Sequence, residues 1–226
     1  MKRRNFRVLF AIFVFSSFLF LSPAVCPAQE TGKTTELKIT PGGSCEEELW
    51  EADRRCLNGR CEDAVYLYDR FLERDDACHG DLRGDAFFRR GRAKETMNDF
   101  RGAVSDYGLA LQAKPDSAKF REALGRGYYK LANQKERLGD FRGALADYLK
   151  ALELTPGLPE AADGVASIYL EIGNKKQERG ELKSAMEDYE KALRYSPNHP
   201  AVREAKKNLE ERLKYKAAER DAMFTF

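Results

Sequence analysis

The chain has 226 residues, of which 42% are hydrophobic and 34% are charged. This mixture excludes a polytopic membrane protein and a fully disordered chain, and 17 glycines and 8 prolines are too few for a collagen-like protein. Lysine and arginine total 39 against 37 acidic residues, so the formal net charge is only +2 and we expect no nucleic-acid partner.

The first 28 residues have the layout of a secretory signal peptide. Residues 1–7 carry four positive charges, residues 8–21 are apolar except for two serines, and Cys26 and Ala28 suit the −3 and −1 positions of a cleavage site. The apolar core is short for a transmembrane helix, which needs ~20 residues. We predict cleavage after Ala28 and export to the periplasm or another secretory compartment. An uncleaved anchor is the alternative, and we expect membrane association only in that case.

A predicted linker, residues 29–43, leads into a degenerate first helix pair, residues 44–84. Ser44 followed three residues later by Glu47 is typical of a capping box at the start of a helix. Asn58-Gly59 is typical of the turn that leads into the second helix of the pair.

Four cysteines lie in this first pair, and disulfides persist in an exported chain. Cysteines at opposite ends of one helix are too far apart to bond, because a disulfide needs Cα atoms within ~7 Å. In an antiparallel pair, the start of one helix lies beside the end of the other. We therefore predict the disulfides Cys45–Cys78 and Cys56–Cys61. The cysteine spacing is not that of a zinc site, and we expect no metal and no cofactor.

Three segments beginning at Asp99, Asp140 and Glu181 then align without a gap at an offset of 41 residues. Apolar residues at steps of three and four predict one helix in each segment, and a longer helix precedes it. A fixed period of this size is typical of a solenoid. The coincident residues are Ala103, Ala144 and Ala185; Asp106, Asp147 and Asp188; Tyr107, Tyr148 and Tyr189; and Pro115, Pro156 and Pro197.

Small residues also recur in the upstream helices, at Gly91, Ala132 and Gly173, and they allow two helices to pack closely. Asn98, Gly139 and Gly180 precede the second helices, and we expect a left-handed conformation there because Gly and Asn adopt it at helix ends. For the three repeated aspartates we expect a repeated structural hydrogen bond or a solvated row, not catalysis.

This pattern resembles the tetratricopeptide repeat family, which has Gly or Ala in its first helix, Ala, an aromatic residue and Ala in its second, and a closing Pro. The resemblance covers residues 85–197 as three units and implies an all-α, right-handed superhelix of stacked antiparallel helix pairs. The period is 41 residues instead of ~34, and we expect the excess to lengthen each first helix at its start. Residues 198–226 are predicted to form a capping helix and a frayed tail.

By the same resemblance, the first helices line a concave face. We predict that a stripe on this face binds a peptide segment, with rings taking side chains and amides pairing with backbone. Its residues are Phe88, Arg92, Glu95, Arg126, Tyr129, Asn133, Glu136, Leu170, Asn174 and Gln177. Alternatively, the stripe packs on the next unit or faces solvent.

The sequence contains no phosphate loop, no nucleophile elbow and no zinc-protease motif, so we do not expect an enzyme. We expect a protein–protein interaction scaffold or assembly adaptor in the cell envelope, with a protein or peptide partner. The alternative is a chaperone-like holder of unfolded exported clients. The sequence leaves the oligomeric state open.

Overall fold

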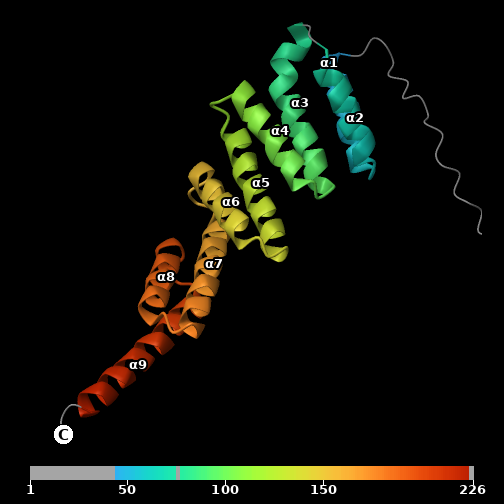
Figure 1. Ribbon diagram of the computed structural model, residues 1–226. Helices are drawn as coiled ribbons and strands as arrows, with labels where there is room; N and C mark the ends of the chain where they lie inside the picture. Colours follow the sequence, from blue (N-terminus) through green and yellow to red (C-terminus); the bar gives the residue numbers. More distant parts are fainter. Residues whose placement is uncertain (1–43, 75–76, 224–226) are drawn as a thin grey trace, which may run out of the picture. The chain divides into compact units, whose positions relative to one another are not determined.

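The computed structural model describes residues 44–74 and 77–223. In this part of the chain there are helices and no strands, and the helices follow one another in chain order (Figure 1). They are α1 (Cys45–Leu57), α2 (Cys61–Leu72), α3 (Ala77–Thr96), α4 (Phe100–Ala113), α5 (Ala118–Arg137), α6 (Phe141–Leu154), α7 (Pro159–Glu178), α8 (Leu182–Tyr195) and α9 (Pro200–Met223). The predicted signal peptide, the linker and residues 224–226 lie outside the described residues.

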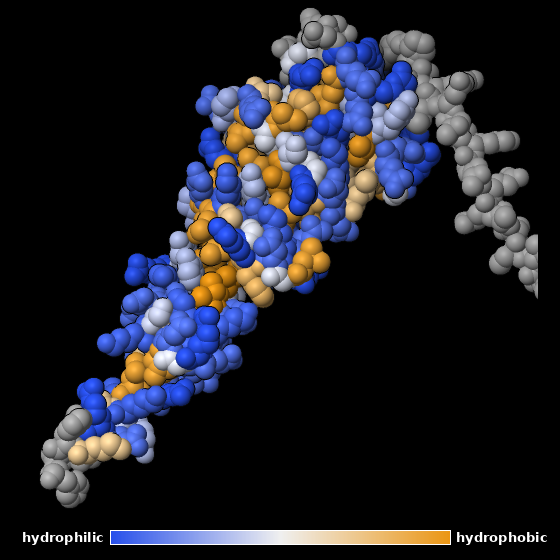
Figure 2. Space-filling view, in the orientation of Figure 1, coloured by the Kyte–Doolittle hydropathy of each residue, from blue (hydrophilic) through white to orange (hydrophobic). Residues whose placement is uncertain are grey.

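The helices pack as antiparallel neighbours, which confirms the predicted all-α solenoid of stacked helix pairs. The first helices α3, α5 and α7 have 20 residues each, and the second helices α4, α6 and α8 have 14. Apolar patches alternate with hydrophilic side chains along the row (Figure 2). None of the described helices is long and apolar enough to cross a membrane.

The start of α3 differs from the predicted unit boundary. We placed the first unit at residues 44–84 and the next from residue 85, but α3 already begins at Ala77. The first unit has no closing proline, so no local breaker marks where it ends. The early start agrees with the expectation that the long period lengthens first helices at their N-terminal ends.

The helix cap at Ser44 and the turns before the second helices form at the residues that the sequence predicted. Ser44 Oγ accepts a hydrogen bond from the Glu47 N–H at 3.3 Å, and Glu47 Oε2 accepts from the Ser44 N–H at 3.0 Å, which completes the capping box. Asn98, Gly139 and Gly180 all have positive φ, at 62°, 80° and 82°. These residues end the first helices in the left-handed conformation and reverse the chain.

A buried tyrosine of each second helix packs on a small residue of the preceding first helix. A Cβ at Gly91 would lie 2.8 Å from the Tyr107 ring, and one at Gly173 would lie 2.5 Å from the Tyr189 ring. Ala132 occupies the same repeat position and is fully buried in the cluster that contains Tyr148. The repeat therefore depends on a close approach between helix backbone and ring.

The three repeated aspartates are buried and form a repeated ion pair with lysines of the preceding helix. The partners are Lys94 for Asp106 at 2.8 Å, Lys135 for Asp147 at 2.5 Å and Lys176 for Asp188 at 2.5 Å. This is a structural contact of the kind we expected, and the solvated row is not found at these positions.

The first pair is closed by the predicted Cys56–Cys61 disulfide, which joins the end of α1 to the start of α2. Cys45 is disulfide-bonded as well. The side chain of its predicted partner, Cys78, lies outside the described residues, so that pairing stays a prediction.

Helix α9 covers the other end of the row. Val202 and Leu209 are fully buried in the cluster that contains Tyr189 and Ala192 of α8. Because no helix follows α9 in the described residues, α9 takes the place of a first helix without a second. This agrees with the predicted capping helix.

Candidate functional site

Three hollows open beside the first helices. One of 760 Å³ is lined by Trp50 and Leu57 of α1 and by Arg92 of α3, among others. A second, of 560 Å³, lies where the end of α3 and the start of α4 meet α5. A third, of 360 Å³, lies between α5 and the turn that precedes α7. Each of the three hollows is therefore lined in part by residues of a first helix.

The second and third hollows share two neighbouring residues of α5, Tyr129 and Lys130. The Tyr129 ring is half-buried and packs against Tyr148, with the two centroids 6.1 Å apart. Lys130 forms an ion pair with Glu95 of α3. The middle of α5 therefore separates two hollows with one aromatic ring that the fold holds in place.

Six of the ten predicted stripe residues line these hollows. Arg92 lines the first hollow, four residues line the second, and Tyr129 recurs in the third with Arg126. The second hollow takes Glu95, Tyr129, Asn133 and Glu136. Phe88, Leu170, Asn174 and Gln177 line none of the three hollows.

The position of Phe88 differs from the expected groove ring. Phe88 is 8% exposed, and its ring stacks on Phe120 with the centroids 5.2 Å apart. Lys119 Nζ lies 4.2 Å from the centroid of the Phe88 ring. Phe120 belongs to the extra turns at the start of α5, so the lengthened helix covers Phe88. Leu170 also packs against a core cluster, that of α8 and α9. For these two residues the alternative of packing on the next unit describes the structure.

The polar residues of the stripe are held by the buried tyrosines of the second helices. Tyr107 Oη donates to Glu95 Oε2 at 2.6 Å, and Tyr148 Oη donates to Glu136 Oε2 at 2.6 Å. The amide oxygen of Asn133 also lies within hydrogen-bond distance of Tyr148 Oη, so the single hydroxyl proton is shared between the two acceptors. In α8, Tyr189 Oη lies 2.7 Å from Asn174 Oδ1 and 3.1 Å from Gln177 Oε1, and these two acceptors share its single proton. The amide oxygens are thus used within the fold, and the amide N–H groups remain to donate to a partner.

Burial and these hydrogen bonds keep the tyrosines protonated. The pKa values of Tyr107 and Tyr148 are raised far above the usual value for tyrosine. Burial is the largest cause, and the hydrogen bond to a carboxylate is the next largest. Burial alone raises the pKa of Tyr189, whose partners are uncharged amides. Each hydroxyl is therefore a fixed donor that orients one or two polar side chains of the first helix.

At the second hollow, one carboxylate is paired with a cation and the other accepts a hydrogen bond from a neutral hydroxyl. Glu95 accepts from Tyr107 and pairs with Lys130, and Glu136 accepts from Tyr148. In the described part of the chain, neither Arg92 nor Arg137 forms an ion pair. These two guanidinium groups leave positive charge available at the first and second hollows.

The described residues offer little for catalysis. Ser167 Oγ lies 3.3 Å from His199 Nε2, but His199 Nδ1 is buried and has no hydrogen-bond partner among them. A general base of the Ser–His kind is oriented by a third group on that nitrogen, so this contact lacks the arrangement of a relay. Within residues 44–74 and 77–223, no cluster of His, Cys, Asp and Glu side chains is suited to a metal ion.

Comparison with solved structures finds similar chains, of which two named below are described as TPR proteins. The chain is similar to "MamA protein", with 16% identity, a TM-score of 0.45, and coverage of 77% of this chain and 88% of that one. It is similar to "a thermophilic TPR protein" of Thermus thermophilus, with 16% identity, a TM-score of 0.34, and coverage of 73% and 98%. It is also similar to YrrB, "a TPR protein with an unusual peptide-binding site", with 18% identity, a TM-score of 0.33, and coverage of 71% and 90%. None of the curated proteins compared with the chain matches it.

A family model described as "Tetratricopeptide repeat" matches residues 125–157 and 166–199. Each match begins seven residues after the start of a first helix, since α5 begins at Ala118 and α7 at Pro159. The family unit therefore fits each helix pair without its first two turns, which accounts for the long period. Residues 125–157 and 166–199 are therefore two tetratricopeptide repeats, each carried by one of the stacked helix pairs.

Proposed function

We propose that the chain is a protein-interaction scaffold that binds an extended segment of a partner protein across α3 and α5. The observation that supports this most directly is the pair of hollows on the two sides of Tyr129. In an extended segment, side chains two residues apart lie on the same side and about 7 Å apart. In the proposed complex, one side chain of the segment enters each hollow, and the Tyr129 ring lies between them.

The polar groups around Tyr129 supply the remaining contacts. The Asn133 amide is oriented by Tyr148 and can donate to a backbone carbonyl of the segment. Arg137 is exposed at the second hollow and can pair with a carboxylate. Since the Asn133 amide is already held by the fold, it loses little conformational freedom when the segment docks.

We also propose that this scaffold works in the cell envelope. The basic, apolar and small-residue segments of residues 1–28 support export. The Cys56–Cys61 disulfide supports an oxidising compartment, because such bonds are rare where thiols are kept reduced. The intact mass of the exported protein tests cleavage after Ala28.

A photo-crosslinking amino acid at position 129 tests the binding surface. Tyr66 provides the matched control, because it is 50% exposed on α2 and lines none of the three hollows. In an envelope extract, we expect position 129 to capture a small set of proteins through one short segment each, and position 66 to capture none of them.

Two outcomes contradict the proposal. Equal capture from both positions shows that Tyr129 is not at a specific site. Capture of many unfolded proteins, independent of position, supports instead the chaperone-like holder that the sequence left as the alternative.

A further inference from the structure

One face of α1 is exposed from the first turn of the helix to its last. Its residues are Glu46, Glu47, Trp50, Arg54 and Leu57, and all five are exposed. With 3.6 residues per turn, these side chains lie within about 60° of Trp50 around the helix axis. Trp50 is 68% exposed and Leu57 is 85% exposed, although tryptophan and leucine are usually buried. This surface, the α1 face, therefore presents apolar groups that the described part of the chain does not cover.

Trp50 occupies a repeat position that can be identified from the tyrosine contacts. Tyr68 Oη donates to Asp53, 15 residues earlier in the chain, and the same spacing separates the tyrosine and the asparagine in the pairs α5–α6 and α7–α8. Asp53 of α1 therefore corresponds to Asn133 of α5. Trp50 lies three residues before Asp53, so it corresponds to Lys130 of α5.

At this repeat position, the later first helices contact the helix before them. Lys130 of α5 forms an ion pair with Glu95 of α3. Arg89 of α3, 41 residues before Lys130, forms an ion pair with Asp53 of α1. In the described part of the chain no helix precedes α1, whereas α9 covers the other end of the row. Trp50 therefore occupies a position that joins neighbouring helices, but without a neighbour.

The charges of the α1 face are complementary to those of a second copy of the same face. Glu46 lies four residues before Trp50, and Arg54 lies four residues after it. When two copies of α1 pack antiparallel with Trp50 at the two-fold axis, each Glu46 lies opposite the Arg54 of the other copy. The same pairing brings the two indole rings together at the centre.

Both charged groups are available for this contact. The Glu46 side chain forms no hydrogen bond or ion pair among the described residues. Arg54 pairs with Glu51 of its own helix, but the Arg54 side chain is 72% exposed. Glu51 also bonds to Arg55 at 2.7 Å, so it keeps a cationic partner when Arg54 turns toward a second copy.

We propose that two copies of the chain associate through the α1 face, with the Trp50 rings at the two-fold axis and a Glu46–Arg54 pair on either side. Tryptophan and arginine are among the residues that contribute most binding energy at the centres of protein interfaces. Of the three hollows, Trp50 and Leu57 line only the first. The dimer therefore leaves the hollows beside Tyr129 free and goes beyond the proposed peptide binding.

Sedimentation velocity of the full exported chain at increasing concentration tests the dimer. A contact between two 13-residue helices is small beside the ~1,600 Å² of a standard interface, so we expect dissociation in the micromolar range. We expect Trp50→Ala, Glu46→Arg and Arg54→Glu each to raise the dissociation constant by about tenfold or more. The double variant Glu46→Arg/Arg54→Glu reverses both charges and should bring the constant back to within about threefold of that of the unaltered chain.

The matched control is Arg203→Glu, which alters an exposed arginine of α9 and changes the net charge as Arg54→Glu does. This control is expected to dimerise like the unaltered chain. A chain that stays monomeric at every concentration overturns the proposal. A dimer that the double variant fails to restore overturns it as well, because the two charges then do not meet across the axis.

Trp50 offers a second measurement, because it is the only tryptophan of the chain. Its fluorescence emission should move to shorter wavelength as the concentration rises and the ring leaves water. Emission at short wavelength even in dilute solution shows that residues of the same chain cover the ring. Emission that stays at long wavelength in concentrated solution shows that the ring is left for a different partner. Either result overturns the proposal.

Discussion

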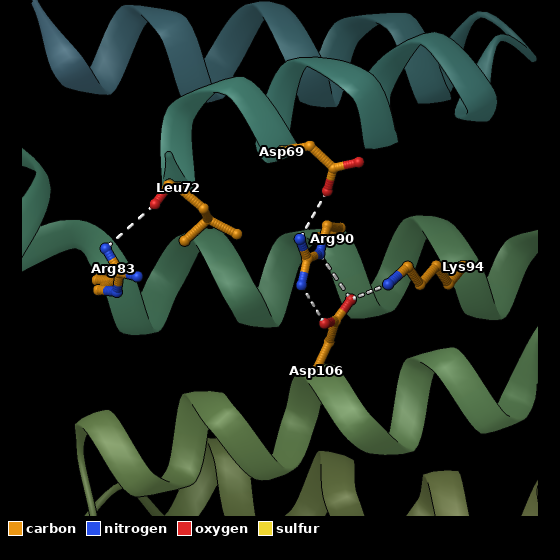
Figure 3. Close-up of polar contacts among 6 residues, drawn as sticks. All are labelled: Asp69, Leu72, Arg83, Arg90, Lys94 and Asp106. Atoms are coloured by element: carbon orange, nitrogen blue, oxygen red, sulfur yellow. Dashed lines mark hydrogen bonds and ion pairs between the residues drawn. The ribbon is translucent and has the colours of Figure 1, made fainter. Parts of the chain in front are cut away.

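The junction between the first pair and the second differs from the junction between the second pair and the third. Arg90 and Leu131 occupy the same repeat position, 41 residues apart, in α3 and α5. Arg90 bonds to Asp69 of α2 and to Asp106 of α4, so that charge joins three helices (Figure 3). Leu131 lies instead in an apolar cluster with Ala103 of α4. One position of the repeat thus joins units either by charge or by apolar packing.

The charge network of the first junction continues inside the second pair, where Asp106 of α4 contacts Arg90 and Lys94 of α3. Asp106 is 1% exposed and pairs with both Arg90 and Lys94, whereas Asp147 is 8% exposed and pairs with Lys135 alone. Burial lowers the pKa of Arg90, but the hydrogen bonds and charge of Asp106 outweigh burial and raise it. Buried charges require partners in fixed geometry, so we expect Asp106 to tolerate substitution less well than Asp147.

The largest effect is expected from Asp106→Ala. The substitution leaves Arg90 and Lys94 without their shared carboxylate in a buried site, and removing one partner of a buried pair costs about 3–5 kcal/mol of unfolding free energy. Asp147→Ala leaves one lysine that is 25% exposed, so its cost is expected to be smaller. Urea unfolding followed by circular dichroism compares the two variants.

Arg90→Leu provides the reverse comparison, because it copies Leu131 into the first junction. Asp106 keeps Lys94, and Asp69 is 45% exposed to water, so we expect this variant to lose little stability. If Arg90→Leu is as destabilising as Asp106→Ala, the charge network itself holds the junction together, and a leucine cannot replace the arginine at this repeat position.

The next effect concerns the disulfide of the first pair. Cys56→Ser/Cys61→Ser opens a loop with a sequence separation of five residues, and loop entropy gives a loss of about 2 kcal/mol. The helices α1 and α2 are the shortest of the described residues, at 13 and 12 residues, so they depend most on this link. Hydrogen exchange should show faster exchange in α1 and α2 with protection in α5–α8 unchanged. Equal loss in all helices contradicts a local role.

A smaller effect is expected where a buried tyrosine ring packs on the small residue of the preceding first helix, because this residue is glycine in one unit and alanine in another. Gly173→Ala places a Cβ against the Tyr189 ring, and the resulting overpacking should cost about 1–2 kcal/mol even though alanine favours helices. Ala132→Gly at the equivalent position removes a buried methyl group and should cost about 1 kcal/mol. Thermal melts measure both. A stabilised Gly173→Ala shows that α7 and α8 separate easily to admit the methyl group.

The sequence predicted those features that local signals or repetition determine. The capping box at Ser44, the positive φ at Gly139 and the Cys56–Cys61 link depend on a few neighbouring residues. The repeat gave the helix pairs and the rows of aspartates and tyrosines. These features need no knowledge of distant contacts.

Long-range packing could not be predicted in the same way. Phe88 is buried because the extra turns at the start of α5 bring Phe120 onto its ring, and no local pattern encodes that contact. The predicted stripe also took no account of hydrogen bonds from the tyrosine hydroxyls. Tyr148 lies 12 residues after Glu136 and 15 residues after Asn133. Tyr189 follows Gln177 and Asn174 at the same two spacings. That recurring spacing is the signal that could have identified which polar groups the fold uses.

The smallest effect, and the one that depends on pH, is expected from Tyr148→Phe. At neutral pH the variant loses hydrogen bonds to Asn133 and Glu136, which should cost about 1 kcal/mol. The pKa of Tyr148 is raised in the folded state, so above pH ~10 the unfolded chain ionises first and folded stability falls by up to ~1.4 kcal/mol per pH unit. Phenylalanine does not ionise, so this contribution is absent from the variant.

The difference in stability between the two proteins should therefore shrink above pH ~10 and change sign near pH ~10.6, where the ionisation of the unfolded tyrosine offsets about 1 kcal/mol. Urea unfolding at several pH values between neutral and strongly basic measures it. Tyr215→Phe is the matched control, since this tyrosine is 71% exposed on α9 and should show no such crossing. A difference that stays constant with pH would mean that Tyr148 ionises as readily in the folded chain as in the unfolded one. In that case the hydroxyl is not the fixed donor that orients Asn133, and the Asn133 amide at the second hollow is not positioned before a partner binds.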